Sequence, residues 1–268
     1  MNKFLTLINS DRKTVRWGTI FVSLLVGALL WESVGWSSNQ AIMAPLIGGG
    51  DHPGTIPRLW KYFVHDEEYR LSLLQSVGLF TTGFSLALLG AIPLGIVMAR
   101  FATLRVALES YILVLYVTPM IALIPFVMSL FGFDFWPKVL VVYLFAFFPI
   151  LYNTLEGARS VKPEMLEVAK SFRSSEVAIW RDILIPYTLP YALTGIRQAA
   201  GRALVGMVAA EFLLSTSGLG EELITASRNF DMAGVLATIL VITGLGITFM
   251  RTAQAFEKKY AAWRGVDR

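Results

Sequence analysis

Three charged side chains lie inside one long apolar segment, residues 189–214. Arg197 and Arg202 interrupt it, Arg202 near the middle, and Glu211 lies toward one end. Two kinds of chemistry would justify charges there: a positive lining for an anionic solute, or structural contacts that hold helices together. At about 100° per residue, Arg197 and Glu211 share a helix face while Arg202 points elsewhere. We therefore favour a structural role for Arg202 and leave Arg197 open.

A second patterned segment is residues 156–188, which read as two short amphipathic helices. The first is expected to begin at Pro163, which suits an initial helical position, with Glu164 at the positive end of the helix dipole. The second is expected to be capped by Ser174, with Glu176 in its first turn. Apolar side chains recur at helical spacing in both: Met165, Val168, Ala169 and Phe172 in the first, Val177, Trp180, Ile183 and Leu184 in the second.

These apolar faces need a surface to cover them. Periodicity alone favours packing of both helices on their own protein, because amphipathic loop helices usually pack that way. The alternative is that a separate protein receives part of this surface.

Several chemistries are excluded by residue type. The chain has no cysteine, and its only histidines, His52 and His65, lie outside the predicted spans. It contains neither a His-Glu-x-x-His zinc motif nor a Gly-x-x-x-x-Gly-Lys-Ser/Thr phosphate loop. We therefore predict no metal site, no bound cofactor and no enzymatic activity. A secondary transporter driven by protons or sodium is a rival class, but the sequence shows no obvious internal repeat or acidic relay.

The elements that must position these residues are membrane helices. The chain has 268 residues, 55% hydrophobic and 16% charged, with mean hydropathy +0.61, which is too apolar for a soluble domain. We predict an all-α membrane protein with a single domain over residues 1–268 and six spans, each long enough to cross roughly 30 Å of hydrocarbon. The predicted spans are residues 15–35, 71–99, 111–132, 139–155, 189–214 and 232–250.

The Lys and Arg residues predict the topology, because such residues concentrate on the cytoplasmic side. With the N-terminus inside, 16 of the 23 fall in cytoplasmic segments, five outside and two in the fifth span. Both termini and residues 156–188 are therefore expected in the cytoplasm. This distribution also explains the pI near 9.3 without nucleic acid as a partner. A cleaved signal peptide is the alternative for the first span, but that run is long and no clear cleavage site follows.

The loop resembles the EAA loop of permeases of binding-protein-dependent ABC importers, whose pattern is Glu-Ala-Ala, three residues, Gly, nine residues and Ile-x-Leu-Pro. Here Glu167, Ala169, Ile183 and Pro186 match at the same spacing, and Arg173 replaces the glycine. The resemblance implies that the loop contacts an ATPase. The residues expected to make that contact are Glu164, Glu167, Ala169, Arg173, Ser174, Val177, Trp180 and Leu184.

Neighbouring segments resemble one subgroup, the nitrate, sulfonate, taurine and bicarbonate permeases. The segments that carry this likeness are Thr118-Pro119 to Pro125, Phe147-Phe148-Pro149-Ile150, Gly195-Ile196-Arg197, Gly201 to Gly206, Ala210-Glu211 and Gly218-Leu219-Gly220. With the charged residues of the fifth span, Pro119 and Pro125 are our candidates for the translocation pathway.

The resemblance implies the type I ABC importer permease fold in a bacterial plasma (inner) membrane. The implied partners are ABC ATPase subunits, an extracytoplasmic solute-binding protein, membrane lipid and a second permease copy, with a homodimer preferred. ATP and Mg²⁺ would bind to the partner ATPase. The implied solute is a small anion such as nitrate, bicarbonate or a sulfonate; a vitamin-like or aromatic solute is the alternative.

Overall fold

The computed structural model describes residues 13–39, 41–50, 52–214 and 217–261. Within these ranges every extended regular element is a helix, and the only β pairing is an isolated bridge between Gly49 and His52. The chain divides into two compact units. One contains the described residues up to Arg70 and Glu222–Leu240, and the other Leu71–Glu221 and the described residues from Val241 onward.

In the first unit, an ion pair and an aromatic contact hold a short helix, α3 (Thr55–Val64), which follows α2 (Lys13–Ser37). Arg58 of α3 forms a 2.7 Å ion pair with Asp231, and the Tyr62 ring stacks on Tyr69 at 4.1 Å between centroids. Asp231 immediately precedes α12 (Met232–Ala261), and α11 (Leu219–Arg228) ends just before it. These contacts hold α3 against residues that are distant in sequence.

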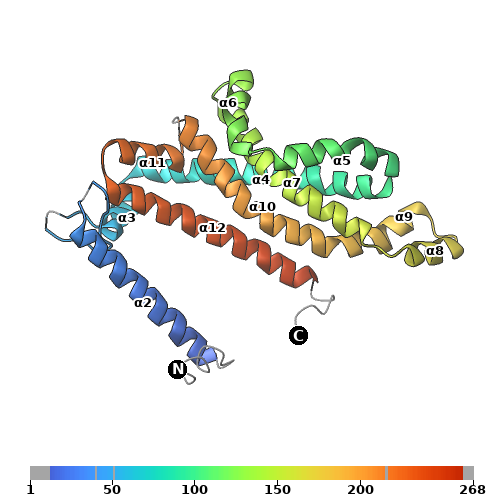
Figure 1. Cartoon of the computed structure of the whole chain (residues 1–268), viewed down its shortest axis with the longest axis horizontal. Coiled ribbons are helices and arrows are strands. Elements are labelled where there is room, and N and C mark those ends of the chain that lie inside the picture. Colours follow the sequence, from blue (N-terminus) through green and yellow to red (C-terminus); the bar gives the residue numbers. More distant parts are fainter. Residues whose placement is uncertain (1–12, 40, 51, 215–216, 262–268) are drawn as a thin grey trace. The chain divides into compact units, whose positions relative to one another are not determined.

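The core of the second unit is built on α4 (Glu67–Arg100), α7 (Phe135–Arg159) and α10 (Ile185–Leu214). Figure 1 shows α7 and α10 crossing beside each other. Small residues make this approach possible: a Cβ added at Gly195 would meet Asn153 and the Pro149 backbone, and one at Gly206 would meet the Phe145 ring. The sequence pattern of small residues in residues 189–214 therefore marks the packing face of α10.

Residues 111–132, predicted as one span, are divided between two helices. α5 (Ala102–Val117) ends at Thr118, and α6 (Met120–Phe131) begins after Pro119, with a bend of 101° between them. Thr118 and Pro119 both have extended backbone angles. The break has a direct cause, because proline disfavours helical geometry in the residue before it and cannot donate a backbone hydrogen bond.

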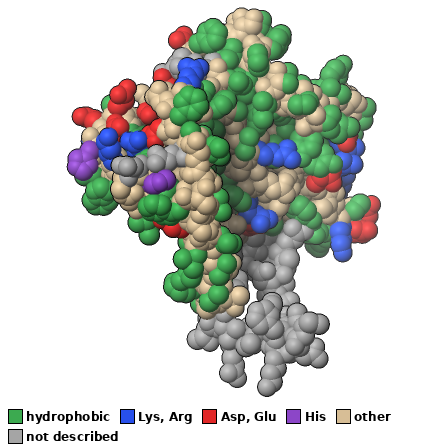
Figure 2. Space-filling model, turned by 60° about the vertical axis from the view of Figure 1, so that its left-hand side comes forward, with side chains coloured by type: hydrophobic (Ala, Val, Ile, Leu, Met, Phe, Trp, Pro, Cys, Tyr) green, Lys and Arg blue, Asp and Glu red, His purple; other side chains and the backbone are tan. Residues whose placement is uncertain are grey.

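The structure is that of an all-α membrane protein. By length and composition, four described helices could cross a membrane, or five if α5 and α6 form one broken span: α2, α4, α7 and α12, with the bent pair. On the face shown in Figure 2, hydrophobic side chains cover much of the surface and charged ones gather in a few groups. α10 is long enough, but it carries the charged residues Arg197, Arg202 and Glu211 and is not among these candidates. The count of six spans stays a prediction.

Candidate coupling hairpin and intramembrane charged sites

Residues 160–184 form a helical hairpin between α7 and α10, made of α8 (Pro163–Ser171), α9 (Glu176–Ile179) and a π-helical turn, η1 (Trp180–Leu184). Figure 1 shows α8 and α9 at the end of the α7 and α10 pair. α8 begins at Pro163, as predicted. The cap of α9 is Ser175, whose Oγ accepts a hydrogen bond from the Ala178 N–H at 3.3 Å. The prediction of Ser174 as the cap is therefore wrong by one residue.

The turn between α8 and α9 explains the glycine position of the loop pattern. Arg173 has φ +52°, a left-handed conformation that glycine adopts without a steric penalty. The Ser174 N–H donates to the Ala169 carbonyl at 3.0 Å, and the Arg173 N–H donates to the Lys170 carbonyl at 2.8 Å. These two bonds form a Schellman motif, in which a left-handed residue ends the helix. The replacement of glycine by arginine thus preserves the turn but adds backbone strain.

The hairpin has a small core of its own. Val161, Ala169, Ile179 and Leu184 are buried together, and the Trp180 ring packs partly against them. Ala169 and Leu184 lie on apolar helix faces, as the sequence predicted. Both side chains, however, point into the core of the hairpin. Leu184 is only 4% exposed, so it does not lie on the surface that we predicted a partner would contact.

Other residues of the hairpin expose apolar side chains. Phe172 is 82% exposed and Val177 is 74% exposed; Met165 and Val168 are also exposed. An open groove of about 380 Å³ is lined by Glu164, Met165, Val168, Ala169 and Ile183, so it reaches the edge of the small core. Glu167 and Arg173 are exposed as well. The hairpin therefore buries part of its apolar surface and leaves another part open, beside exposed charged groups.

An ion pair missed by sequence reasoning ties this hairpin to α4. The Arg100 guanidinium donates to both Glu176 oxygens, Nη2 to Oε1 at 2.7 Å and Nε to Oε2 at 3.2 Å. The hydrogen bond from Arg100 lowers the pKa of the exposed Glu176 carboxyl below its ordinary value. Spacing gave no sign of this pair, because the partners are 76 positions apart.

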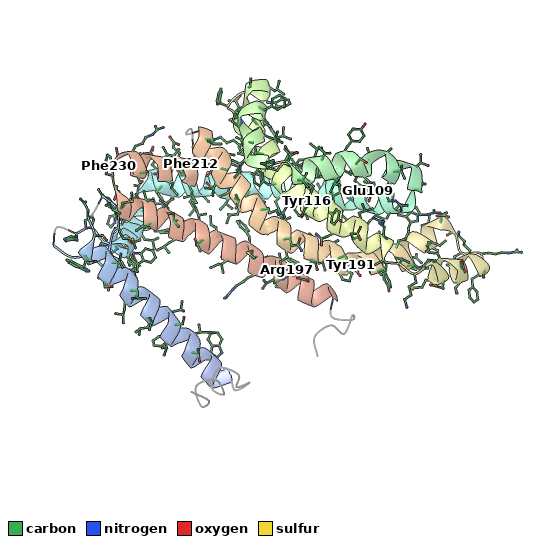
Figure 3. The ribbon with its side chains drawn as sticks, viewed as in Figure 1. Glu109, Tyr116, Tyr191, Arg197, Phe212 and Phe230 are labelled. Atoms are coloured by element: carbon green, nitrogen blue, oxygen red, sulfur yellow. The ribbon has the colours of Figure 1, made fainter. Side chains whose placement is uncertain are left out.

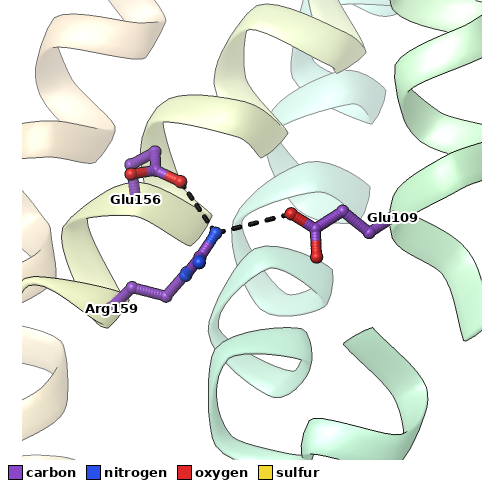
Figure 4. A network of polar contacts seen from close by, with 3 residues as sticks. All are labelled: Glu109, Glu156 and Arg159. Carbon is purple, nitrogen blue, oxygen red and sulfur yellow. Dashed lines mark hydrogen bonds and ion pairs between the residues drawn. The ribbon is translucent and has the colours of Figure 1, made fainter. Parts of the chain in front are cut away.

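A second charged contact joins α5 to the end of α7, next to the hairpin. Figure 4 shows Arg159 between two carboxylates, with Nη1 3.1 Å from Glu156 and 3.5 Å from Glu109. All three side chains are substantially exposed, so each pair contributes little to stability. Their effect is to orient α7 where it leads into the hairpin.

Glu211 is held in a closed polar cluster. It is 1% exposed and accepts hydrogen bonds from the Ser76 hydroxyl at 2.7 Å and from the Gly220 N–H at 3.0 Å. Ser76 in turn accepts from the Leu219 N–H at 2.8 Å. The Glu211 carboxylate and the Ser76 hydroxyl therefore each satisfy one backbone N–H group at the start of α11, where intrahelical partners are lacking. A Cβ at Gly218, which has φ +93°, would collide with the Glu211 carboxylate.

Arg197 forms an ion pair across α10 and α12. Its Nε lies 3.1 Å from Glu257 Oε2, and the Thr194 hydroxyl donates to the other Glu257 oxygen at 3.0 Å. Figure 3 labels Arg197 on α10, where that helix runs beside α12. Its own chain thus provides a carboxylate for Arg197, and the pair joins α10 to α12.

Arg202 has a different environment from the other two. Its guanidinium donates to the Tyr116 hydroxyl at 3.2 Å and lies 5.1 Å from the centre of the same ring. Among the residues that the structure describes, no carboxylate lies within ion-pair distance of it. Arg202 is exposed and lines a cavity of about 320 Å³. The hydrogen bond to Tyr116 joins α10 to α5, and the structural role of Arg202 stays a prediction.

The predicted pathway residues are therefore not gathered at one place. Pro119 and Arg202 line the same cavity, whereas Pro125, Arg197 and Glu211 lie outside it. Tyr116, which sequence reasoning missed, lines it too. The aromatic residue one turn before a helix-breaking Thr-Pro pair was the available signal. The described residues contain no group of three or more His, Cys, Asp and Glu that could hold a metal ion.

Comparisons with known proteins agree with the resemblance. A family model described as "Binding-protein-dependent transport system inner membrane component" matches residues 91–262. A putative ABC transporter permease of Methanocaldococcus jannaschii is 34% identical over 68% of this chain and 69% of its own length. The taurine transport system permease protein TauC of Escherichia coli is 31% identical over 67% of this chain and 65% of its own length.

A solved structure shows the same fold. The crystal structure of an amino acid ABC transporter with histidines covers 76% of this chain and 94% of its own, with a TM-score of 0.55. At 15% sequence identity, this likeness concerns the fold alone. The prediction of the ABC importer permease fold is confirmed.

Proposed function

We propose that this chain, which belongs to the family of binding-protein-dependent transport system inner membrane components, forms the membrane pathway of an ATP-driven importer of a small anion. As an inner membrane permease subunit it is not itself an enzyme, and a separate ATPase hydrolyses the ATP. In the proposal, ATPase subunits, an extracytoplasmic solute-binding protein and a second copy of this chain complete the importer. ATP and Mg²⁺ bind to the ATPase, and no cofactor binds here.

The observation that carries the coupling part of this proposal is the outward side of the hairpin. Phe172 and Val177 project apolar surface beside the exposed Glu167 carboxylate. An interface is typically anchored by a few apolar side chains, and charged groups at its edge fix orientation. Phe172, Val177 and the groove at Met165 and Val168 are the proposed anchors. Glu167 is the proposed orienting charge, and Trp180 supports them from inside.

The hairpin is joined to the membrane helices in a way that suits force transmission. It continues directly into α10, and the pair between Arg100 and Glu176 ties it to α4. A displacement of the hairpin would therefore reach two helices of the core. We place the hairpin and both termini in the cytoplasm, supported by the distribution of Lys and Arg.

The proposed solute is a small anion. One relative is a taurine transport system permease protein, and taurine carries a sulfonate. The open environment of Arg202 supports an anion independently of that name. A vitamin-like or aromatic solute is the alternative, and an ion-driven secondary mechanism is another; the same transport assay would reveal either.

The test replaces the outward apolar side chains of the hairpin. Phe172→Asp and Val177→Asp should each abolish capture of the ATPase and ATP-driven uptake into vesicles, with membrane insertion retained. Val177→Leu is the matched control, since it keeps the apolar surface, and should behave as wild type. Glu167→Ala should retain capture of the ATPase, because an exposed charge contributes little to affinity. It should lose uptake, because this charge is proposed to fix the orientation of the two proteins. Normal capture and uptake in both Asp variants would disprove coupling through this surface.

A further inference from the structure

The cavity beside the break between α5 and α6 contains unused hydrogen-bonding capacity. A guanidinium carries five N–H donors, and the one contact of Arg202 with a described residue is to Tyr116. The Tyr116 oxygen accepts that bond, so its own O–H can still donate. One cationic donor and one neutral donor thus lie together, and no carboxylate of a described residue forms an ion pair with Arg202. Such a pair suits an oxyanion, which accepts from both.

The position of the cavity adds a third favourable element. Met120 and Ile121, the first residues of the twelve-residue α6, line it. The first N–H groups of a helix lack intrahelical partners, and the helix dipole is positive at that end. The break at Pro119 therefore turns the start of a helix toward the cavity that already holds Arg202.

The remaining walls of the cavity are apolar, and this limits the chemical class of ligand that would fit. Phe145, Phe148 and Val205 line the cavity with other hydrophobic side chains, and Thr118 is the only other polar one. The Thr118 hydroxyl already donates to the Val114 carbonyl at 2.7 Å. A bare inorganic anion would leave these walls unused, whereas a solute with a short carbon chain would cover them. The volume of about 320 Å³ is within the usual range for small-molecule pockets.

We infer that Arg202 and Tyr116 form a transient binding site for the head group of a small organic oxyanion of the alkanesulfonate type, whose carbon part lies against Phe145, Phe148 and Val205. This inference rests on the proposed function and adds a solute class and a site to it. Arg202 and Tyr116 determine specificity within the membrane, after the solute has left the binding protein.

The experiment uses the complete importer in vesicles, with butanesulfonate and nitrate as the two probes. Arg202→Leu should lower the maximal rate of butanesulfonate uptake about tenfold or more, because a hydrogen-bonded charge in the pathway is lost. Tyr116→Phe should lower it about threefold. The half-saturating concentration should not change in either variant, since the binding protein sets it. Arg202→Lys should recover part of the rate, as it retains the charge but not the planar fork.

The matched control is Tyr111→Phe, which removes the same hydroxyl from an exposed residue of α5 outside the cavity. It should transport at the wild-type rate. ATPase capture and basal ATP hydrolysis are measured for every variant, and both should be retained in Arg202→Leu and Tyr116→Phe.

Three results would overturn the inference while leaving the permease assignment intact. Unchanged butanesulfonate uptake in Arg202→Leu and Tyr116→Phe would exclude the site. Loss of ATPase capture in Arg202→Leu, with normal uptake in Tyr116→Phe, would give Arg202 the structural role instead. If the wild-type importer takes up nitrate but not butanesulfonate, an organic oxyanion is excluded as the solute. Failure of the wild type to import either probe would contradict the anion in the proposed function itself.

Discussion

Two charged residues of one helix, α10, have opposite environments. At Glu211 the chain surrounds a carboxylate with donors from α4 and α11 and leaves it 1% exposed. Nine positions earlier, Arg202 is exposed to a cavity and contacts a single phenol. Both residues are equally unusual in an apolar segment. We propose different roles for them, because the polar atoms of Glu211 are satisfied by its own protein and most donors of Arg202 are left available.

Arg197 lies between these extremes and sharpens the comparison. Its guanidinium has a carboxylate partner, but both side chains keep some exposure, 39% for Arg197 and 23% for Glu257. The three residues therefore form a series from closed to open. The cost of removing each one from the folded protein should follow the same order.

The largest effect is expected for Glu211→Leu. The substitution strands the Ser76 hydroxyl and the Gly220 N–H, and it should reduce the stability of the protein by about 3 kcal/mol or more. Thermal unfolding of the detergent-purified protein checks this. Glu211→Gln keeps the shape of the side chain and one acceptor oxygen, so it should reduce the stability clearly less than Glu211→Leu does. Equal stability of the Leu variant and the wild type would mean that the cluster is not structural.

Gly218→Ala tests the same cluster from the other side. The new Cβ would meet the Glu211 carboxylate, and φ +93° is strained for alanine. We expect a loss of about 1–3 kcal/mol, measured by the same unfolding assay. Gly201→Ala is the control, because a Cβ there meets nothing within 4 Å. Similar stability of the two alanine variants would argue against close packing at Gly218.

Arg197→Leu should have an intermediate effect, about 1–2 kcal/mol, because a partly exposed pair loses one partner. A double-mutant cycle with Glu257→Leu would measure the coupling between the two side chains. Additive effects of the single substitutions would show that the observed pair does not brace α10 against α12.

Arg202→Leu should change stability by less than about 0.5 kcal/mol, as expected for a substitution that breaks no closed network. If Arg202→Leu destabilises the protein more than Arg197→Leu does, the proposed order from closed to open sites is wrong. Such a result would mean that the open cavity hides a structural contact made in the assembled importer.

The smallest effect is expected at the exposed pair of Arg100 and Glu176, which lies outside the spans. The folded pKa of Glu176 is lowered by Arg100, so its stabilisation is fully present above the ordinary pKa of about 4.3. It is lost as the pH falls through the lowered value. Glu176→Gln should therefore unfold slightly earlier than wild type at pH 7 and together with it in strong acid. A difference that persists in acid would require another explanation.

The hairpin shows how far spacing alone can predict. The start of α8 at Pro163 and the turn at Arg173 follow from local rules for proline and glycine positions, which act within a few residues. The cap at Ser175 rather than Ser174 was a choice between adjacent, chemically identical side chains. The inward direction of Leu184 depends on contacts with Val161 and Ala169, and periodicity could not distinguish that packing from an outward face.

The sequence by itself determined the membrane class, the long apolar helices and the patterned loop, because hydropathy and proline geometry act locally along the chain. Only the tertiary structure decided which intramembrane charge is satisfied. The partners of Glu211 and Arg197, namely Ser76 and Glu257, lie 135 and 60 positions away, and helix packing alone brings them into contact. Arg202 differs from Arg197 for the same reason: the neighbouring helix offers it a tyrosine at a cavity instead of a carboxylate.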